Sequence, residues 1–562
     1  MSTTPPTRLY LLGLPGSGKS TVARLVADLL GWRFVDTDEL IVARAGRPIA
    51  AIYADDGEPA FRNHEAAALA QAAQMERVVV ATGGGIVGRA ANRALMAATG
   101  WRVALDVAPS VALARLTRAE LGGELAARPL LAGADPLARL HALRQRRQQW
   151  YAEVEEVIAT DDRAAPEVAA RVVAGLVARG LAPGAVGASA TRYVRMSGGA
   201  EYDAVVAWGG LAALGERITE LALPARVHVV SDSHVAWLYG DTVLTQLAAA
   251  GLDVTLWAMP AGETSKTAGE LARLYDWLAE RRAERGEAVV ALGGGVVGDL
   301  AGYAAATYLR GLPLIQVPTS LLAQVDASIG GKVGIDHPRG KNLIGAFHQP
   351  RLVLADPATL LTLPPRARRE GWAEVVKYGV ALDAAYFAAL ERDADQLAAL
   401  DPAATTTAIA DSVRLKAGVV EGDERESSRG ARQLLNYGHT VGHALESVTG
   451  YGVWPHGEAV AVGMAAAVRI GARMGVTPPD VVRRQDALLA RFGLPLRCPG
   501  VSAAALLRAT QWDKKVRGGA VRWVLPTAIG AATVRGDVPE EIVRDALLEL
   551  GADPNPPASE EG

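Results

Sequence analysis

The chain has 562 residues, 50% hydrophobic and 21% charged, a composition that excludes a disordered or fibrous protein. Its 58 basic and 61 acidic side chains leave a formal net charge of −3, which gives no general electrostatic case for binding nucleic acid. A single cysteine, no secretory signal and no apolar stretch of about 20 residues lead us to expect a cytoplasmic protein without a membrane partner.

The length predicts three or four units at about 150 residues each. The segment 182–190 consists of small, uncharged residues, as expected of a flexible linker. Near Asp356, short apolar runs give way to long helical patterns. The predicted organisation is a first domain over 1–181, a linker over 182–194, an α/β domain over 195–355, an α-helical domain over 356–550 and a disordered tail over 551–562.

The first domain opens with a phosphate-binding motif. Short apolar runs at 8–12 and 77–81, each followed by glycines and helical periodicity, predict a parallel sheet covered by helices. The first run leads into GLPGSGKS, which fits GxxxxGK[ST] and precedes a helical pattern. Backbone N–H groups of such a loop bind phosphate, its lysine reaches the β and γ oxygens, and its serine can hold Mg²⁺. The loop therefore predicts an ATP site, but it does not indicate which molecule accepts the phosphate.

Several later motifs could hold that acceptor. FVDTD predicts that Asp36 and Asp38 lie at alternate positions of a strand end and so share a face. One carboxylate would bind Mg²⁺ and the other would bind a substrate hydroxyl. Two aspartates with this spacing, however, more often belong to a solvated loop. Arg62 follows an acidic loop, and ATGGG ends a strand with backbone that a small ligand could approach closely. Arg128 follows a Gly-rich segment typical of a mobile lid.

These motifs, in this order, resemble shikimate kinase over residues 8 to 175, with a generic nucleoside-type kinase as the alternative. The resemblance implies that Asp38, also a catalytic residue, binds shikimate with Arg62, Gly84 and Arg147. It also implies that Arg128 is the catalytic arginine of the lid and that Arg115 lies next to the adenine of ATP. Asp36 and Ser20 would lie on the side of the site where Mg²⁺ binds. The implied ATP-binding loop residues are Gly13, Gly16, Ser17, Gly18, the catalytic Lys19, Ser20 and Thr21. Arg144 and Arg146, on the same predicted helix as Arg147, are equally well explained as a solvated basic face.

The second part of the chain contains a glycine-rich strand-to-helix turn and clustered lysines. ALGGGVVGD ends a predicted strand and opens a helix, as in a dinucleotide-binding turn, although not in the usual GxGxxG register. GETSK upstream offers a carboxylate for ribose and a lysine for phosphate. Only eight lysines occur in the chain, so Lys332 and Lys341 in Gly-rich loops predict an anion site rather than ordinary surface turns.

A polar stripe in the helical part predicts a metal site. Arg432, Asn436, His439 and His443 follow the spacing i, i+4, i+7, i+11, which would place them on one helix face. Two histidines and one carboxylate with open positions are a catalytic Zn²⁺ arrangement. The HTVGH sequence is not a zincin protease motif, because Thr440 stands where that motif needs a glutamate.

From about 195 to 550 the chain closely resembles 3-dehydroquinate synthase, through GETSK, GGGVVGD, DASIGGK, GKN, AEVVK, LLNYGHTVGHALE, HGE and DKK. The resemblance implies Zn²⁺ or Co²⁺ on Glu374, His439 and His456. It implies NAD⁺ at Asp232, Glu263, Lys266, Gly294, Gly295, Asp299, Thr319, Ser320, Lys332, Lys341 and Thr362. The implied substrate residues are Arg310, Asp326, Lys332, Lys341, Asn342, Lys416, Arg432, Asn436, His443 and Lys514 or Lys515, with Lys332, Lys416 and His443 catalytic. Arg310 would reach the site of a neighbouring subunit, which implies a homodimer.

The expected protein is thus an α/β P-loop kinase domain fused to a synthase module with a Rossmann-like NAD domain and a helical metal- and substrate-binding domain. The implied reactions are ATP-dependent 3-phosphorylation of shikimate, and conversion of 3-deoxy-arabino-heptulosonate 7-phosphate to 3-dehydroquinate with phosphate release. Two alternatives remain at this point. The second module could be a metal- and NAD-dependent polyol dehydrogenase, although a neutral polyol needs no cluster of lysines. The first could be a non-catalytic ATP-binding appendage.

Overall fold

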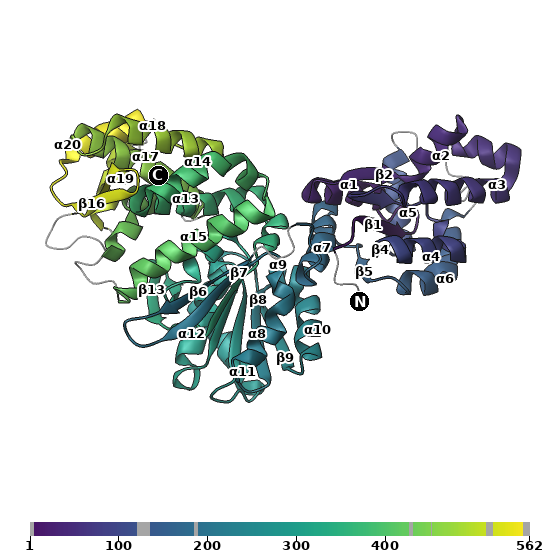
Figure 1. Ribbon diagram of the computed structural model, residues 1–562, viewed down its shortest axis with the longest axis horizontal. Helices are drawn as coiled ribbons and strands as arrows, with labels where there is room; N and C mark the ends of the chain where they lie inside the picture. Colours follow the sequence, from purple (N-terminus) through teal and green to yellow (C-terminus); the bar gives the residue numbers. More distant parts are fainter. Residues whose placement is uncertain are drawn as a thin grey trace, which may run out of the picture. The chain divides into compact units, whose positions relative to one another are not determined.

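The computed structural model describes residues 5–120, 135–184, 189–425, 431–450, 452–512 and 521–554. The chain divides into two compact units, Met1–Pro183 and Gly184–Gly562, drawn in purple to blue and in blue to yellow (Figure 1). Within the described part of the chain, no helix is both long enough and apolar enough to cross a membrane.

The first unit is a parallel sheet with the strand order β2-β3-β1-β4-β5. Its strands are β1 (Arg8–Gly13), β2 (Arg33–Asp36), β3 (Val78–Ala81), β4 (Trp101–Asp106) and β5 (Glu156–Ala159). Its helices are α1 (Lys19–Leu30), α2 (Thr37–Ala45), α3 (Ile49–Ala72), η1 (Ile86–Gly88), α4 (Ala90–Thr99), α5 (Pro109–Glu120), α6 (Pro136–Ala152) and α7 (Ala165–Ala178). Because β1 is central and its apolar side chains are fully buried on both faces, the loop after it opens at the carboxyl edge of the sheet.

The second unit contains a larger sheet with the order β6-β7-β14-β11-β10-β8-β9. Only β6 runs antiparallel to its neighbour. The strands are β6 (Ser189–Arg195), β7 (Glu201–Ala207), β8 (Arg226–Asp232), β9 (Asp253–Met259), β10 (Ala288–Gly293), β11 (Leu314–Pro318) and β14 (Leu352–Ala355). The strands β12 (Lys332–His337) and β13 (Gly340–Phe347) form a separate hairpin. The chain leaves β8 toward β9 and then returns on the other side to β10, so a switch point lies between β8 and β10.

Short and long helices connect these strands and form the rest of the unit. The helices among the strands are η4 (Gly210–Ala213), α8 (Leu214–Glu220), α9 (Ser233–Val235), η5 (Ala236–Gly240), α10 (Asp241–Ala249), η6 (Glu263–Ser265), α11 (Ala268–Glu280), α12 (Gly295–Thr307), η7 (Tyr308–Arg310), η8 (Ala323–Ala327) and η9 (Pro357–Leu361). The helical part contains α13 (Pro365–Leu382), α14 (Ala384–Ala398), α15 (Pro402–Glu421), η10 (Ala431–Asn436), α16 (His439–Thr449), α17 (His456–Arg473), α18 (Pro479–Arg491), α19 (Ala503–Trp512) and α20 (Glu540–Glu549), with the hairpin β15 (Trp523–Ala528) and β16 (Ala531–Arg535).

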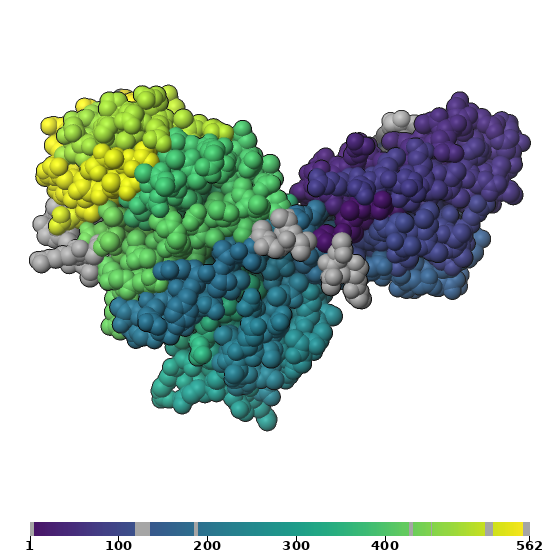
Figure 2. All heavy atoms as spheres, viewed as in Figure 1, coloured from purple at the N-terminus to yellow at the C-terminus, as the bar shows by residue number. Residues whose placement is uncertain are grey.

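The helical part and the sheet share one hydrophobic core. Val353 and Ala355 of β14 belong to the same buried cluster as Tyr378 of α13 and Val460 of α17. In the space-filling view the green and yellow residues of the helical part form one lobe and the teal residues of the sheet another (Figure 2). The predicted boundary near Asp356 therefore separates two layers of one compact unit, so side chains of both can meet in a single site.

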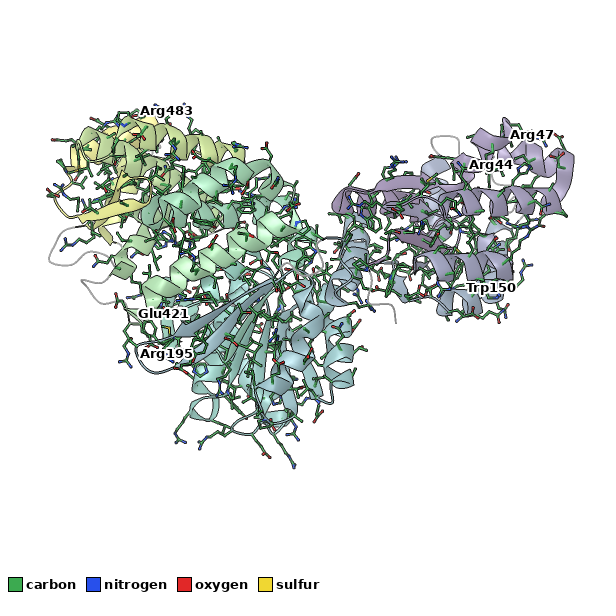
Figure 3. The ribbon with its side chains drawn as sticks, in the orientation of Figure 1. Arg44, Arg47, Trp150, Arg195, Glu421 and Arg483 are labelled. Atoms are coloured by element: carbon green, nitrogen blue, oxygen red, sulfur yellow. The ribbon has the colours of Figure 1, made fainter. Side chains whose placement is uncertain are left out.

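The structure differs from the predicted linker 182–194 in its second half. Residues from Ser189 onward form β6, which pairs with β7 along its whole length. In the middle of β6, the Arg192 guanidinium lies 3.0 Å from the Glu421 carboxylate. At its end, the backbone N–H of Arg195 donates to the same carboxylate at 3.2 Å; Arg195 and Glu421 are labelled in Figure 3. The strand begins with the small residues Ser189 and Ala190, which continue the composition of the segment before it, so the sequence did not mark where the strand starts.

The predicted disordered tail 551–562 also begins too early. Ala552 is 4% exposed, and Asp553 forms a parallel bridge with Ser502. A residue with a paired backbone and a buried side chain belongs to the packed unit. The tail prediction for 555–562 lies outside the described residues.

Candidate active sites

The phosphate loop of the first unit lies between β1 and α1, as the motif predicts. Gly16 and Gly18 have φ values of 81° and 87°, a left-handed backbone that glycine adopts without strain. The Lys19 ammonium donates to the carbonyl oxygens of Gly13, at 3.1 Å, and Leu14, at 2.8 Å. The lysine is thus held across the loop, where it can reach phosphates bound at the N-terminus of α1.

The two aspartates after β2 adopt a different geometry from the predicted one. Asp36 ends the strand, but Asp38 lies in the first turn of α2, so the pair does not alternate along a strand. Asp36 instead caps α2, because its Oδ1 accepts the N–H of Asp38 at 2.9 Å. Its Oδ2 accepts the Ser20 hydroxyl at 2.7 Å, which brings together the two residues predicted on the Mg²⁺ side.

The predicted acceptor-binding side chains converge on the turn Gly83–Gly85 after β3. A Cβ at Gly83 would lie 2.9 Å from Asp38 Oδ1, and one at Gly85 would overlap the Arg62 guanidinium. Arg147 donates to the carbonyl oxygen of Gly84. Only glycine leaves room for these groups, so the turn gathers the predicted carboxylate and two guanidiniums around a largely buried backbone. A small acid with hydroxyl groups needs this set of partners.

Sequence analysis missed Glu65 in this cluster. Its side chain is 1% exposed, and its Oε2 lies 2.9 Å from Arg62. Burial raises the pKa of Glu65, and the Arg62 charge opposes that shift. The glutamate therefore holds the Arg62 guanidinium at the glycine turn. Its position three residues after Arg62 on one helix was the available signal.

The other basic candidates of this unit separate into different environments. Arg115 donates to Thr160 Oγ1 at 3.2 Å and lines a shallow pocket with Ser110, Arg118 and Asp161, so its predicted adenine contact remains a prediction. One guanidinium nitrogen of Arg144, Nη2, donates to both carboxylate oxygens of Asp106, at 3.0 and 2.8 Å. Of the four arginines on α6, Arg147 alone is buried, at 7% exposure. Arg128 lies outside the described residues.

In the second unit, the predicted metal ligands meet in a compact group. One ligand atom each from Glu374, His439 and His456 lie within 4.8 Å of one another. His439 Nε2 lies 3.5 Å and His456 Nε2 3.9 Å from Glu374 Oε1. Glu374 is fully buried. Lys377 contacts its Oε2, yet neither carboxylate oxygen accepts a hydrogen bond in good geometry. A buried carboxylate with unused acceptor capacity beside two imidazoles fits a divalent cation.

The local backbone explains why this group forms, and it corrects one prediction. Arg432 and Asn436 lie in η10, whereas His439 opens α16, so the four polar residues do not share one helix face. Gly438, with φ 80°, breaks the helix between them. His456 likewise opens α17. Both ligand histidines are therefore the first residues of long helices.

Each ligand histidine has its second ring nitrogen occupied. His439 Nδ1 lies 3.0 Å from the carbonyl oxygen of Tyr437, and His456 Nδ1 lies 3.1 Å from Glu446 Oε2. Burial alone would raise the pKa of Glu446, but the hydrogen bond with His456 and the charge of Lys341 lower it to about 2. Glu446 was missed by sequence analysis, although its place one turn after His443 on the same helix was a usable signal.

Four predicted substrate or cofactor residues form buried ion pairs nearby. Lys416 donates to Asp326 Oδ1 at 2.7 Å, and the Tyr378 hydroxyl donates to the same oxygen at 2.6 Å. The lysine and tyrosine contacts oppose the desolvation of Asp326 and lower its pKa. Lys266 pairs with Asp299 at 2.6 Å and also contacts Asn342. Lys377 and Tyr378, both fully buried, were not among the predicted site residues.

The remaining substrate candidates lie in different elements, and of these His443 has a contact with the metal group. Arg432 is 3% exposed, donates to the carbonyl oxygen of Asp423 at 3.1 Å, and lies over the ring of Phe347. The ring centroids of His443 and His439 are 5.3 Å apart, so His443 lies beside the metal group. Lys332 begins β12, Asn436 ends η10, and Arg310 is exposed at η7. Lys514 and Lys515 lie outside the described residues.

The predicted NAD residues collect at the carboxyl ends of the parallel strands. Asp232 ends β8 and caps α9, accepting the N–H groups of His234 and Val235 at 2.9 Å. Gly294 and Gly295 connect β10 to α12, and Thr319 and Ser320 follow β11. Thr362 shares a hydrogen bond of 2.6 Å with Tyr239. Since β8 and β10 flank the switch point, these residues line the place where such sheets bind ligands.

Comparison with known proteins assigns the second unit. Residues 256–370 match the family model of the 3-dehydroquinate synthase N-terminal domain, and residues 371–516 that of the C-terminal domain. A 3-dehydroquinate synthase of Synechococcus sp. is 50% identical over 354 residues, which cover 62% of this chain and 96% of that protein. The chain belongs to the 3-dehydroquinate synthase family. This decides against the polyol dehydrogenase alternative.

Two solved structures have the synthase fold. ValA, the 2-epi-5-epi-valiolone synthase of Streptomyces hygroscopicus, solved with NAD⁺ and Zn²⁺, is 30% identical, with a TM-score of 0.58 over 62% of this chain and 96% of its own. A 2-deoxy-scyllo-inosose synthase solved with carbaglucose-6-phosphate, NAD⁺ and Co²⁺ is 27% identical, with a TM-score of 0.58 over 64% and 100%. The structural likeness thus extends to NAD- and metal-binding members of the fold.

The first unit matches a second family. Residues 15–177 match the shikimate kinase family model. The chain therefore joins a shikimate kinase domain to a 3-dehydroquinate synthase domain, and it is an enzyme of the shikimate pathway with both activities. The predicted fold class, ATP with Mg²⁺ for the kinase, and NAD⁺ with a divalent metal for the synthase agree with these families.

Proposed function

We propose that the second unit converts 3-deoxy-arabino-heptulosonate 7-phosphate to 3-dehydroquinate and phosphate, at the site formed by Glu374, His439 and His456. The observation that carries this is the buried, under-bonded Glu374 carboxylate next to two oriented imidazoles. When bound, NAD⁺ supplies a reversible hydride acceptor and the divalent cation a Lewis acid. We assign NAD⁺ to the residues at the ends of β8, β10 and β11 described above.

The chain's own side chains supply the binding and orientation. Arg432 and Lys332 provide cations for the substrate carboxylate and phosphate, and His443, beside the metal group, holds or donates a proton near the reacting hydroxyl. Lys416 and Asp326 are held as a pair by Tyr378, so each is fixed within the site before substrate arrives.

The first unit, we propose, phosphorylates the 3-hydroxyl of shikimate with ATP. Asp38 accepts the proton of that hydroxyl, while Arg62 and Arg147, at the glycine turn, bind the carboxylate. Lys19 binds the transferred phosphate, and Ser20 with Asp36 marks the place of Mg²⁺. The convergence of these groups on backbone that only glycine permits supports a catalytic domain rather than an ATP-binding appendage.

Metal removal is expected to separate the two reactions. Incubating the full chain with EDTA and then desalting should abolish phosphate release from the heptulosonate phosphate, because Glu374 and both histidines are set up for a cation. Added Zn²⁺ or Co²⁺ should restore it. In the same samples, ADP formation from ATP and shikimate should recover with Mg²⁺ alone. Phosphate release that persists in the chelated enzyme would contradict the synthase proposal.

The protein is further proposed to be a cytoplasmic homodimer whose two synthase sites share Arg310. Leu309 and Arg310 both have positive φ, 48° and 67°, which is strained for residues with side chains. Leu309 is 40% exposed. A strained backbone that presents an arginine and an apolar side chain to solvent supports a contact with a second copy of the chain.

Complementation tests this shared site. Arg310→Ala and Lys416→Ala homodimers should each be nearly inactive, whereas coexpression should form heterodimers in which one site has both residues intact. Random pairing places half the molecules in heterodimers, so about a quarter of wild-type phosphate release should return. Light scattering should give the dimer mass for every sample. A monomeric mass, or no recovery in mixed dimers, would refute the shared site.

A further inference from the structure

The two nitrogens of His456 face different carboxylates. Nε2 lies 3.9 Å from Glu374 Oε1, inside the proposed metal group, whereas Nδ1 lies 3.1 Å from Glu446 Oε2. In this contact the Glu446 carboxylate accepts a hydrogen bond from Nδ1, and Nε2 is left facing Glu374. The glutamate therefore selects the tautomer of His456 that can bind a cation through Nε2.

Glu446 is held on its other side as well. Its side chain is 3% exposed, and its Oε1 lies 3.2 Å from the Lys341 ammonium. That ammonium also lies 3.6 Å from Glu263, one of the proposed NAD residues. Lys341 belongs to β13 of the sheet part, and Glu446 to α16 of the helical part. The carboxylate thus links a proposed metal ligand to a cation near the proposed nucleotide site.

The alternative role for Glu446 is that of a metal ligand. His443, Glu446 and His456 form another group whose ligand atoms lie within 4.8 Å of one another. However, Glu446 Oε2 is committed to His456 Nδ1 and Oε1 to Lys341. A cation in that group would have to displace both partners and stand next to the Lys341 ammonium. The existing contacts favour an orienting role.

We propose that Glu446 is a positioning residue of the synthase site, which fixes the ring of His456 for metal binding through Nε2 and holds Lys341 beside it. The inference rests on the proposed metal site at Glu374, His439 and His456. Partners of this kind typically contribute about 10- to 100-fold to metal affinity.

The test is a metal titration of the full chain without nucleotide, in competition with a chromophoric chelator. Wild type should bind one Zn²⁺ per chain at the synthase site. Glu446→Gln, which keeps the shape but loses the charge, should still bind one Zn²⁺ about 10-fold more weakly, and Glu446→Ala about 100-fold more weakly. The visible spectrum of the Co²⁺ form should change in both variants. The control is Glu391→Gln on α14, which breaks a 2.6 Å pair with Arg484 of α18 and should bind Zn²⁺ as wild type does.

The outcomes distinguish this inference from the proposed function. If wild type binds no Zn²⁺ at this site, the proposed metal centre is wrong, and the inference falls with it. If wild type binds and both Glu446 variants match it in affinity and Co²⁺ spectrum, only the positioning role is refuted. If wild type binds two ions and the variants lose one, Glu446 is a ligand rather than a positioning residue. Thermal denaturation of each variant separates loss of affinity from loss of fold.

Discussion

Replacing Glu374 with glutamine should lower the rate of phosphate release by at least about a thousandfold and leave the kinase reaction at the wild-type rate. Glutamine keeps the volume of the side chain but removes its charge, so a divalent cation loses its only carboxylate in the proposed ligand set. A bound Lewis acid supplies several kcal/mol of transition-state stabilisation, and about 1.4 kcal/mol corresponds to tenfold in rate. Both rates are measured on the same sample, as phosphate and as ADP.

This substitution has a cost in stability that the experiment must separate. Lys377 is 2% exposed and contacts Glu374, so glutamine leaves a buried ammonium without its counter-charge. Such a loss typically costs about 3–5 kcal/mol. His439→Asn removes a ligand without affecting that pair, so it should lose phosphate release with a smaller drop in melting temperature. If either variant keeps substantial phosphate release without bound metal, the ligand assignment is wrong.

Lys19→Met should have the converse effect. The lysine lies across the phosphate loop, bound to the carbonyl oxygens of Gly13 and Leu14. It is the loop's own cation for charge that develops on the transferred phosphate, and loss of one such group costs about 10²–10³ in rate. The expected result is a fall of that size in ADP formation with shikimate, and unchanged phosphate release from the heptulosonate phosphate.

Arg24→Met is a suitable control for this variant. Arg24 lies on α1, five residues after Lys19, with its guanidinium 4.2 Å from the centre of the Phe34 ring. The Arg24→Met substitution removes one positive charge and introduces a methionine on the same helix, as Lys19→Met does. Because Arg24 is not in the phosphate loop, the variant should keep a kinase rate near wild type. A Lys19→Met enzyme that keeps its kinase rate would show that the phosphate loop does not act in catalysis.

Motifs with a fixed local geometry were predictable from the sequence. The phosphate loop requires a strand, glycines and a helix in that order along the chain. The motif GLPGSGKS itself contains the glycines that the turn needs. The same holds for the glycine-rich turn between β10 and α12. In each case the residues that make the site are neighbours in the chain, so periodicity and spacing were sufficient.

Predictions failed where backbone conformation or tertiary contacts decide the result. Spacing placed Arg432 through His443 on one helix, but the left-handed Gly438 divides it. Asp38 was expected on a strand, but Asp36 caps α2 and starts the helix earlier. Glu446 contacts Lys341 and His456 across the fold, and a single sequence does not state those contacts. The pair between Glu65 and Arg62 is local, but the approach of Glu65 to Gly83 is again a contact across the fold.

The start of α16 at His439 and of α17 at His456 has an electrostatic consequence. The peptide dipoles of a long helix leave a positive potential at its first turn, equivalent to roughly half an elementary charge. Two such ends meet where Glu374 places its negative charge. The backbone itself therefore adds positive potential beside Glu374, and because peptide dipoles do not titrate, this contribution persists at every pH at which the fold is intact.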